Sequence, residues 1–151
     1  QLSVKWPNDI MSGSLKICGI LIENIVKNKL IQDIIIGIGV NINQMKFNDL
    51  PNATSIKQIT GKYYNTDEIL SEIVNDIKFY FNFLKEESLV ELQKLYESNL
   101  YRLNKVSTFK LPDSNLISGY INGVNDDGRL KIILENDVEE SYGIKEISLI
   151  N

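Results

Sequence analysis

Residues 31–43 form a nearly continuous run of apolar, mostly β-branched side chains, Ile-Gln-Asp-Ile-Ile-Ile-Gly-Ile-Gly-Val-Asn-Ile-Asn. A run of this kind favours a strand that is buried on both faces of a sheet. Two further strands are predicted upstream, over residues 16–26 and over residues 2–7, where Pro7 ends the strand. Because short segments connect the three strands, we expect them to pair antiparallel.

Helical segments are predicted after this sheet. Residues 51–55 are expected to form a loop that leads into a short helix over residues 56–59. A longer helix is predicted over residues 66–85, with Thr66 as its N-cap. Six apolar residues recur at helical spacing and predict the core-facing stripe of that helix: Ile69, Ile73, Ile77, Tyr80, Phe81 and Leu84. A Ser-Leu-Val-Glu capping box opens a further predicted helix over residues 88–102.

Five short strands separated by turn sequences are predicted after residue 105. They cover residues 106–111, 116–124, 129–134, 138–143 and 146–150. This cadence is typical of a small five-stranded β-barrel. We therefore predict an α+β fold, in which a mixed, mainly antiparallel sheet with helices forms a first domain over residues 1–104. The barrel forms a second domain over residues 105–151.

Composition excludes several classes of function. The 151 residues include no histidine, which excludes Ser–His–Asp triads and histidine-based zinc sites for this chain alone. The formal net charge of −4 argues against a nucleic-acid partner. No apolar run approaches the roughly 18–20 residues of a membrane span, so no membrane partner is expected. The single cysteine, Cys18, cannot form an internal disulfide, which fits a cytoplasmic protein.

Polar residues gather in two segments near the start of the chain. The first is Lys5-Trp6-Pro7-Asn8-Asp9, and the second is Lys16-Ile17-Cys18-Gly19-Ile20-Leu21-Ile22-Glu23. Between them, Ser12-Gly13-Ser14 is expected to reverse the chain and bring the second segment back beside the first. Taken alone, Asn8-Asp9 favours a turn with self-bonding side chains, and Lys16 is typical of a solvated lysine at a strand end.

Together with Gly37-Ile38-Gly39-Val40-Asn41-Ile42-Asn43, these two segments resemble the biotin–protein ligases. Members of that family are also called biotin–[acetyl-CoA-carboxylase] ligases or holocarboxylase synthetases. The three motifs occur in the family's order and spacing, and all of them lie before residue 44. The resemblance implies that residues 1–104 are the C-terminal part of a class II synthetase-like catalytic domain. It also implies that residues 105–151 are an SH3-like barrel.

The resemblance implies a ligase reaction in two steps. The carboxylate of biotin attacks the α-phosphate of ATP, supplied with Mg²⁺, and gives biotinyl-5′-AMP. A lysine amine of a biotin carboxyl carrier protein then attacks the acyl group and releases AMP. Biotin and ATP are thus the implied substrates, the carrier protein is the implied partner, and no permanently bound cofactor is expected.

The family's motifs imply roles for individual positions. Lys16 is implied to be catalytic and to contact both biotin and the adenylate, where its charge neutralises two anions that meet. Asp9 is implied to be catalytic in the second step, in which it orients or deprotonates the acceptor amine. Asn8 and Asp9 are expected near the phosphates as ligands of magnesium, which prefers hard oxygen donors. Lys5 is expected to add phosphate-binding charge.

Three glycines and an asparagine complete the expected site. Gly19 is expected to bind biotin, and Gly37 and Gly39 the adenylate, through close approach of the backbone to the ligand. Asn41 is implied to read the edge of adenine, which suits an amide because an amide both donates and accepts. Strict alternation along a strand places Lys16 and Gly19 on opposite faces. If both line one pocket, a bulge or a twist is required between them.

Other functions stay open at this point. The Gly-Ile-Gly run suggests a doubly wound nucleotide-binding domain, but the third glycine of that motif is absent. A non-catalytic nucleotide- or protein-binding module and a lipoate ligase-like relative remain as alternatives. We also expect the chain to be a fragment that lacks an upstream arginine- and glycine-rich loop of the family, and so to have little activity alone. Exposed sheet edges in such a fragment are expected to allow a homodimer.

Overall fold

The computed structural model describes residues 1–86 and 89–150, and the chain divides into two compact units. The segments of the first unit are Gln1–Leu2 and Asn8–Ser88. The segments of the second unit are Ser3–Pro7 and Leu89–Asn151. The chain therefore passes between the two units close to its start, within the first of the sequence motifs.

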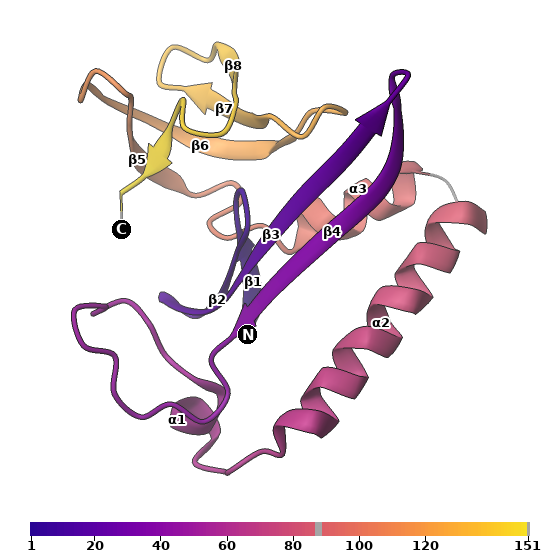
Figure 1. Cartoon of the computed structure of the whole chain (residues 1–151). Helices are drawn as coiled ribbons and strands as arrows, with labels where there is room; N and C mark the ends of the chain where they lie inside the picture. The colour runs from indigo at the N-terminus through magenta and orange to yellow at the C-terminus, as the bar shows by residue number, and fades with distance from the viewer. Residues whose placement is uncertain (87–88, 151) are drawn as a thin grey trace. The chain divides into compact units, whose positions relative to one another are not determined.

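The first unit is built on an antiparallel sheet of β2 (Asp9–Ser12), β3 (Leu15–Lys27) and β4 (Leu30–Val40). β3 and β4 form the long two-stranded ribbon in Figure 1. In the turn between them, Asn28 and Lys29 have positive φ angles of 53° and 64°. Positive φ at both central residues is what a two-residue hairpin requires. The antiparallel pairing predicted for these two strands is confirmed.

The turn predicted at Asn8-Asp9 is present in part, because Asn8 lies in a turn over residues 6–8, whereas Asp9 begins β2. Gly13, whose φ is 60°, lies in the reversal that follows β2. β1 (Leu2–Lys5) is correspondingly shorter than the strand predicted over residues 2–7. The sequence does not reveal β2, because the strand has only four residues and begins at a turn-favouring aspartate. Four residues are too few for alternation to be recognised.

The prediction that the apolar run of β4 is buried on both faces is wrong for this chain. Ile31, Ile34 and Ile35 expose 57%, 41% and 54% of their surface. Among the described strands, β3 is the one that pairs with β4, and the outer half of β3 is exposed as well. An apolar pattern reports what a strand is suited to bury, whereas burial itself depends on the elements that cover it.

Two helices complete the first unit, α1 (Ile56–Thr60) and α2 (Thr66–Glu86). In the predicted stripe of α2, three residues are half-buried, as expected: Ile69, Ile73 and Ile77. The other three residues of that stripe are exposed: Tyr80, Phe81 and Leu84. The predicted core-facing stripe is therefore correct for the first half of the helix and wrong for its second half.

The second unit contains α3 (Leu89–Ser98) and a five-stranded antiparallel sheet. The strands are β5 (Val106–Lys110), β6 (Leu116–Val124), β7 (Leu130–Leu134), β8 (Glu139–Tyr142) and β9 (Ser148–Leu149). All five predicted strands are present, in the spatial order β8-β7-β6-β5-β9. Within the described residues β8 and β9 form the two edges and do not pair, so the sheet is not closed into a barrel. The predicted α+β class is confirmed, and the predicted closure is not.

β1 packs within the second unit, beside the segment that follows α3. The backbone N–H of Val4 donates to the carbonyl of Asn99 over 2.7 Å, and the N–H of Tyr101 donates to the carbonyl of Val4 over 2.8 Å. This pairing explains why α3 ends at Ser98 rather than near residue 102, as its pattern predicts. A helix cannot continue through residues whose backbone groups bond to a neighbouring strand.

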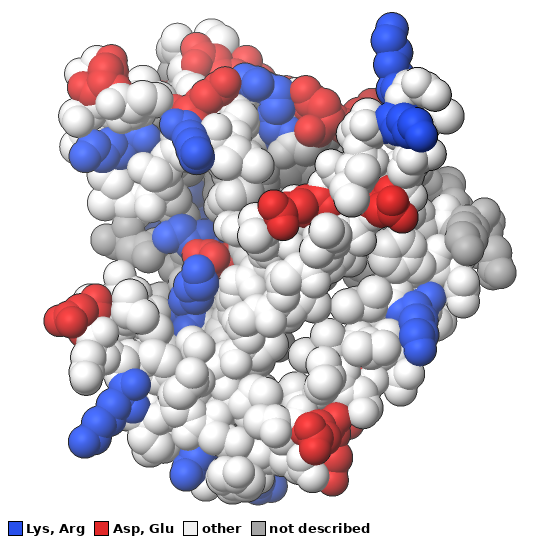
Figure 2. Space-filling model, viewed as in Figure 1, with Lys and Arg blue, Asp and Glu red and all other residues white. Residues whose placement is uncertain are grey.

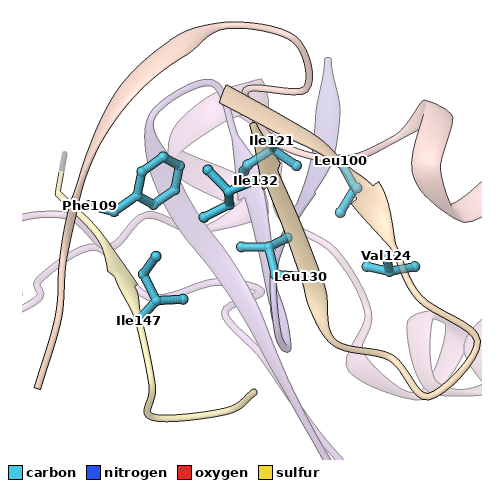
Figure 3. Packing of buried hydrophobic residues seen from close by; sticks show 7 residues of the cluster. All are labelled: Leu100, Phe109, Ile121, Val124, Leu130, Ile132 and Ile147. Atoms are coloured by element: carbon cyan, nitrogen blue, oxygen red, sulfur yellow. The ribbon is translucent and has the colours of Figure 1, made fainter. Parts of the chain in front are cut away.

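The main hydrophobic core lies in the second unit, as Figure 3 shows. Its buried residues are Leu100, Phe109, Ile121, Val124, Leu130, Ile132 and Ile147. Trp6 packs against this cluster, and its Nε1–H donates to the carbonyl of Gly128 over 2.9 Å. An indole that combines apolar contact with one satisfied N–H is typical of a packing residue. Both Trp6 and Gly128 belong to the second unit, so this contact is internal to that unit.

The two compact units differ from the predicted domains, because β1 and α3 pack with the second unit. The limits at residues 1–104 and 105–151 stay a prediction, since packing alone does not show which segments fold independently. The capping box predicted at residues 88–91 begins with Ser88, which lies outside the described residues.

Charged residues are mixed over the surface. Figure 2 shows basic and acidic side chains interspersed on the visible face, with wide uncharged areas between them. That face carries no basic stripe of the kind that marks a nucleic-acid interface. No helix in the described ranges is both long enough and apolar enough to cross a membrane.

Candidate active site

A bulge in β3 decides which side chains share a face of the first unit's sheet. In the pairing of β2 with β3, Asp9 lies opposite Gly19 and Ile10 opposite Cys18, but Met11 lies opposite Lys16. Ile17 is therefore an extra residue on β3. Because one inserted residue reverses the alternation, Lys16 and Gly19 lie on the same face. The bulge that the sequence requires for a shared pocket is present.

Lys16 and Asp9 form an ion pair on this face. Lys16 Nζ lies 2.5 Å from Asp9 Oδ1, and the two side chains are 44% and 27% exposed. A pair that is exposed to this extent contributes about 0–1 kcal/mol to stability, because water screens the attraction. The fold therefore depends little on the pair, and either group can turn to a charged ligand at small cost.

Gly19 provides the space that the ion pair needs. A Cβ atom at this position would lie 3.3 Å from Lys16 Nζ and 3.7 Å from Asp9 Oδ1. The lysine side chain thus passes over the bare backbone of Gly19 to reach the carboxylate on the neighbouring strand. The predicted role of Gly19 is to leave the backbone open to a ligand. The structure gives it a second role, because the absence of a side chain leaves room for Lys16.

Glycines continue this face across the sheet. Gly19 pairs with Gly39, and Leu21 pairs with Gly37, so Asp9, Gly19 and Gly39 form one row across three strands. Cβ atoms at Gly37 and Gly39 would meet only ordinary contacts, at 3.7 Å and beyond. The two glycines are therefore not required by packing. They leave a floor of exposed backbone beside Lys16, on which a flat ligand can lie.

The two predicted asparagines lie next to this floor. The carbonyl of Asn8 accepts from Ile20 N–H over 2.8 Å, which joins the first motif to β3. The N–H of Asn41 donates to the carbonyl of the bulge residue Ile17 over 2.9 Å. Asn41 is half-buried and follows directly on β4, so its backbone is attached to the same bulge that sets the position of Lys16. Lys5 lies on β1 in the second unit, and its role in phosphate binding stays a prediction.

The chemistry of the donors limits what metal this face can hold. Within the described residues, no group of three or more cysteine, aspartate and glutamate side chains is arranged to bind a metal ion. Asn8 and Asp9 offer one amide and one carboxylate. Mg²⁺ is typically held by one or two carboxylates together with substrate phosphates and water. The donors therefore fit a magnesium ion that arrives bound to a nucleotide, and they do not form a cage of their own.

Sequence reasoning missed the segment that runs beside Lys16. The N–H of Lys16 donates to the carbonyl of Asn52 over 2.7 Å, and the N–H of Thr54 donates to the carbonyl of Lys16 over 2.9 Å. Residues 51–55 are a loop, as predicted, but they form a short parallel bridge with β3. One sequence signal pointed to an ordered structure at the end of this loop, because Ser55-Ile56-Lys57-Gln58 matches a capping box. In the structure Thr54 and Ser55 are buried.

An open hollow of about 380 Å³ lies elsewhere, within the second unit. It is lined by Gln93, Val124, Asn125, Asp126, Asp127 and Lys131. None of these residues belongs to the motifs, and its lining mixes both signs of charge. The candidate active site is therefore the face that carries Lys16, and not this hollow.

Comparisons with known proteins relate this chain to biotin ligases. The Biotin/lipoate A/B protein ligase family matches residues 1–41, which include every predicted site residue. The bifunctional ligase/repressor BirA of Bacillus subtilis (strain 168) is 29% identical over 153 residues, which cover 97% of this chain and 44% of that protein. The chain thus spans less than half the length of this relative.

Solved structures of a biotin protein ligase from Aquifex aeolicus share the fold. The apo structure has a TM-score of 0.78 at 29% identity and is matched over 99% of this chain and 65% of that one. The complex of that ligase with biotin and ATP has a TM-score of 0.78 at 28% identity, over 99% and 62% of the two chains. The fold and the motifs of this chain are therefore similar to those of biotin ligases. The resemblance to the biotin–protein ligases in particular is confirmed.

Cys18 gives a way to test the geometry of this face without any ligand. Burial raises the pKa of its thiol, the charge of Lys16 lowers it, and the charge of Asp9 raises it. We expect Asp9→Asn to lower the pKa of the thiol and Lys16→Gln to raise it, because each removes one of these charges. The pH dependence of thiol alkylation measures the shift. Glu23→Gln, on the same strand, is the control and is expected to change nothing. Shifts of equal sign in the two variants would contradict the geometry.

Proposed function

We propose that the protein containing this chain joins biotin to a lysine of a carrier protein through biotinyl-5′-AMP. The observation that carries the proposal is the placement of Lys16 by the bulge, beside Asp9 and over the glycine floor. The similarity to ligases that include a complex with biotin and ATP supports the choice of substrates. The biotin carboxyl carrier domain as acceptor follows from the resemblance of the motifs.

In the first step, a carboxylate oxygen of biotin attacks the α-phosphorus of ATP. The bond from that phosphorus to the bridging oxygen breaks, and pyrophosphate leaves with its electron pair. The nucleophile is already an anion, so a chain without histidine needs no base here. What the reaction requires is charge neutralisation and alignment. Lys16 supplies the charge when its ammonium turns from Asp9 towards the two anions.

In the second step, the neutral amine of the acceptor lysine attacks the acyl carbon of biotinyl-5′-AMP. The bond from that carbon to the phosphate oxygen breaks, AMP leaves, and the nitrogen loses a proton as the amide forms. In this proposal Asp9, released from Lys16 by the bound adenylate, orients the amine and accepts this proton. The half-exposed pair fits this exchange, because a buried pair would resist separation.

The remaining predicted residues bind the nucleotide in this proposal. ATP arrives as its magnesium complex, and Asn8 and Asp9 add oxygen ligands to an ion that the phosphates hold. Asn41 reads the adenine edge with its amide, and Gly37 and Gly39 let the nucleotide lie against the backbone. Lys5 contributes phosphate-binding charge. Cytoplasmic location is part of the proposal, and it is supported by the single free thiol, Cys18.

The main alternative function differs in the acid that is activated. The matching family includes lipoate ligases as well as biotin ligases, so lipoate is the alternative acid. A non-catalytic module that only binds nucleotide or protein is the other alternative. Adenylation of biotin in preference to lipoate by the full-length protein decides between the first two, and the absence of any adenylate would favour the third.

We predict that Lys16→Gln in the full-length protein lowers kcat for biotinyl-5′-AMP formation by about 10²–10³-fold, the usual effect of removing one charge-stabilising group. Exchange of labelled pyrophosphate into ATP measures this step. Lys27→Gln is a matched control, since Lys27 ends the same strand at its far end. Unchanged turnover in Lys16→Gln would overturn the assignment of Lys16.

We also predict that this chain by itself self-associates and makes little biotinyl-5′-AMP. The apolar faces of β3 and β4 are exposed, as Leu21 (59%) and Ile31 (57%) illustrate, and β4 is an open edge. Exposed apolar strands with a free edge favour pairing with a second copy. Sedimentation velocity measures the association. A monomer at all concentrations, or rapid adenylate synthesis by this chain, would count against the prediction.

A further inference from the structure

The segment Asn52-Ala53-Thr54-Ser55 replaces β4 as the neighbour of β3 at Lys16. β4 ends at Val40, opposite Cys18, so its pairing stops just before the bulge. Beyond this point, Asn52 and Thr54 bond to the N–H and the carbonyl of Lys16, over 2.7 Å and 2.9 Å. Both backbone groups of Lys16 therefore depend on one loop.

The same loop also holds Asn41. The N–H of Ile56 donates to the carbonyl of Asn41 over 2.9 Å, while the N–H of Asn41 donates to Ile17. Residues 52–56 thus contact the backbone of the proposed catalytic lysine and that of the proposed adenine-reading asparagine. Any shift of this loop moves both residues together.

Ser55 fixes the loop from inside. Its side chain is fully buried, with 0% of its surface exposed. Its hydroxyl donates to the carbonyl of Gln44 over 2.6 Å and accepts from the N–H of Gln58 over 3.1 Å. The neighbouring hydroxyl of Thr54 donates to Gln58 Oε1 over 3.2 Å. Because a buried hydroxyl with both roles satisfied permits one arrangement of its partners, it defines where the loop lies.

We propose that Ser55 is a positioning residue for adenylate formation, which acts through Lys16 and Asn41 without touching a substrate. The inference rests on the function proposed above. Removal of the hydroxyl leaves a carbonyl and an N–H in the interior without their partner, so the loop relaxes. Lys16 then loses its alignment with the reacting anions, and misplacement of such a group by a fraction of an ångström lowers the rate.

The test is a double-mutant cycle in the full-length protein, with Ser55→Ala and Lys16→Gln made singly and together. Single-turnover formation of biotinyl-5′-AMP is the measured rate, with enzyme in excess over biotin and with saturating ATP, so that weaker adenine binding through Asn41 does not enter the rate. We expect Ser55→Ala to lower the rate at least about tenfold when Lys16 is present, and less than about twofold in the Lys16→Gln background. Ser71→Ala, which removes an exposed hydroxyl that donates to Asp67, is the matched control and is expected to leave the rate unchanged.

Additive losses in the cycle would overturn the inference, because a general loss of structure lowers both backgrounds alike. If Ser55→Ala does not fold, Thr54→Val removes a single hydrogen bond of the same loop and is expected to show the same non-additivity. A Lys16→Gln protein with normal turnover would contradict the proposed function. A slow Lys16→Gln protein combined with additive losses would contradict the role of Ser55 alone.

Discussion

The β-bulge at Ile17 is the constraint on which the candidate site depends. Without the extra residue, Lys16 would lie on one face of the sheet, and Asp9 and Gly19 would lie on the other. The bulge is maintained by backbone hydrogen bonds to Asn41 and to residues 52–54. The ion pair that it creates is too exposed to stabilise the fold by more than about 1 kcal/mol. Backbone bonds therefore fix the geometry, and the charges stay available for a ligand.

The rest of the first unit is arranged around this bulge. Glycines at the positions that face Lys16 keep the sheet bare where a substrate is proposed to lie, and a glycine at residue 19 lets the lysine cross to its partner. The apolar surface of β3 and β4, in contrast, is larger than the described elements of this unit cover. The second unit differs in this respect, because seven of its apolar residues are buried together and form a hydrophobic core.

Much of the fold and part of the site follow from local sequence patterns. The β-branched run predicts β4, turn residues separate the strands of the second unit, and alternation shows that Lys16 and Gly19 share a face only with a bulge. Three features escape such reasoning for physical reasons. β2 is too short for a periodic signal, the bridge of Ala53 to Lys16 joins residues far apart in the chain, and the exposure of Ile35 depends on what covers the strand.

We propose that Lys16, placed by the bulge, lies against the adenylate. Labelling of lysine amines in the full-length protein, with and without a non-hydrolysable analogue of biotinyl-5′-AMP, tests this placement. We expect the analogue to protect Lys16 from the reagent, as read by mass spectrometry, while Lys27 at the other end of β3 reacts as before. Equal labelling of Lys16 in the presence and absence of a saturating analogue would contradict it.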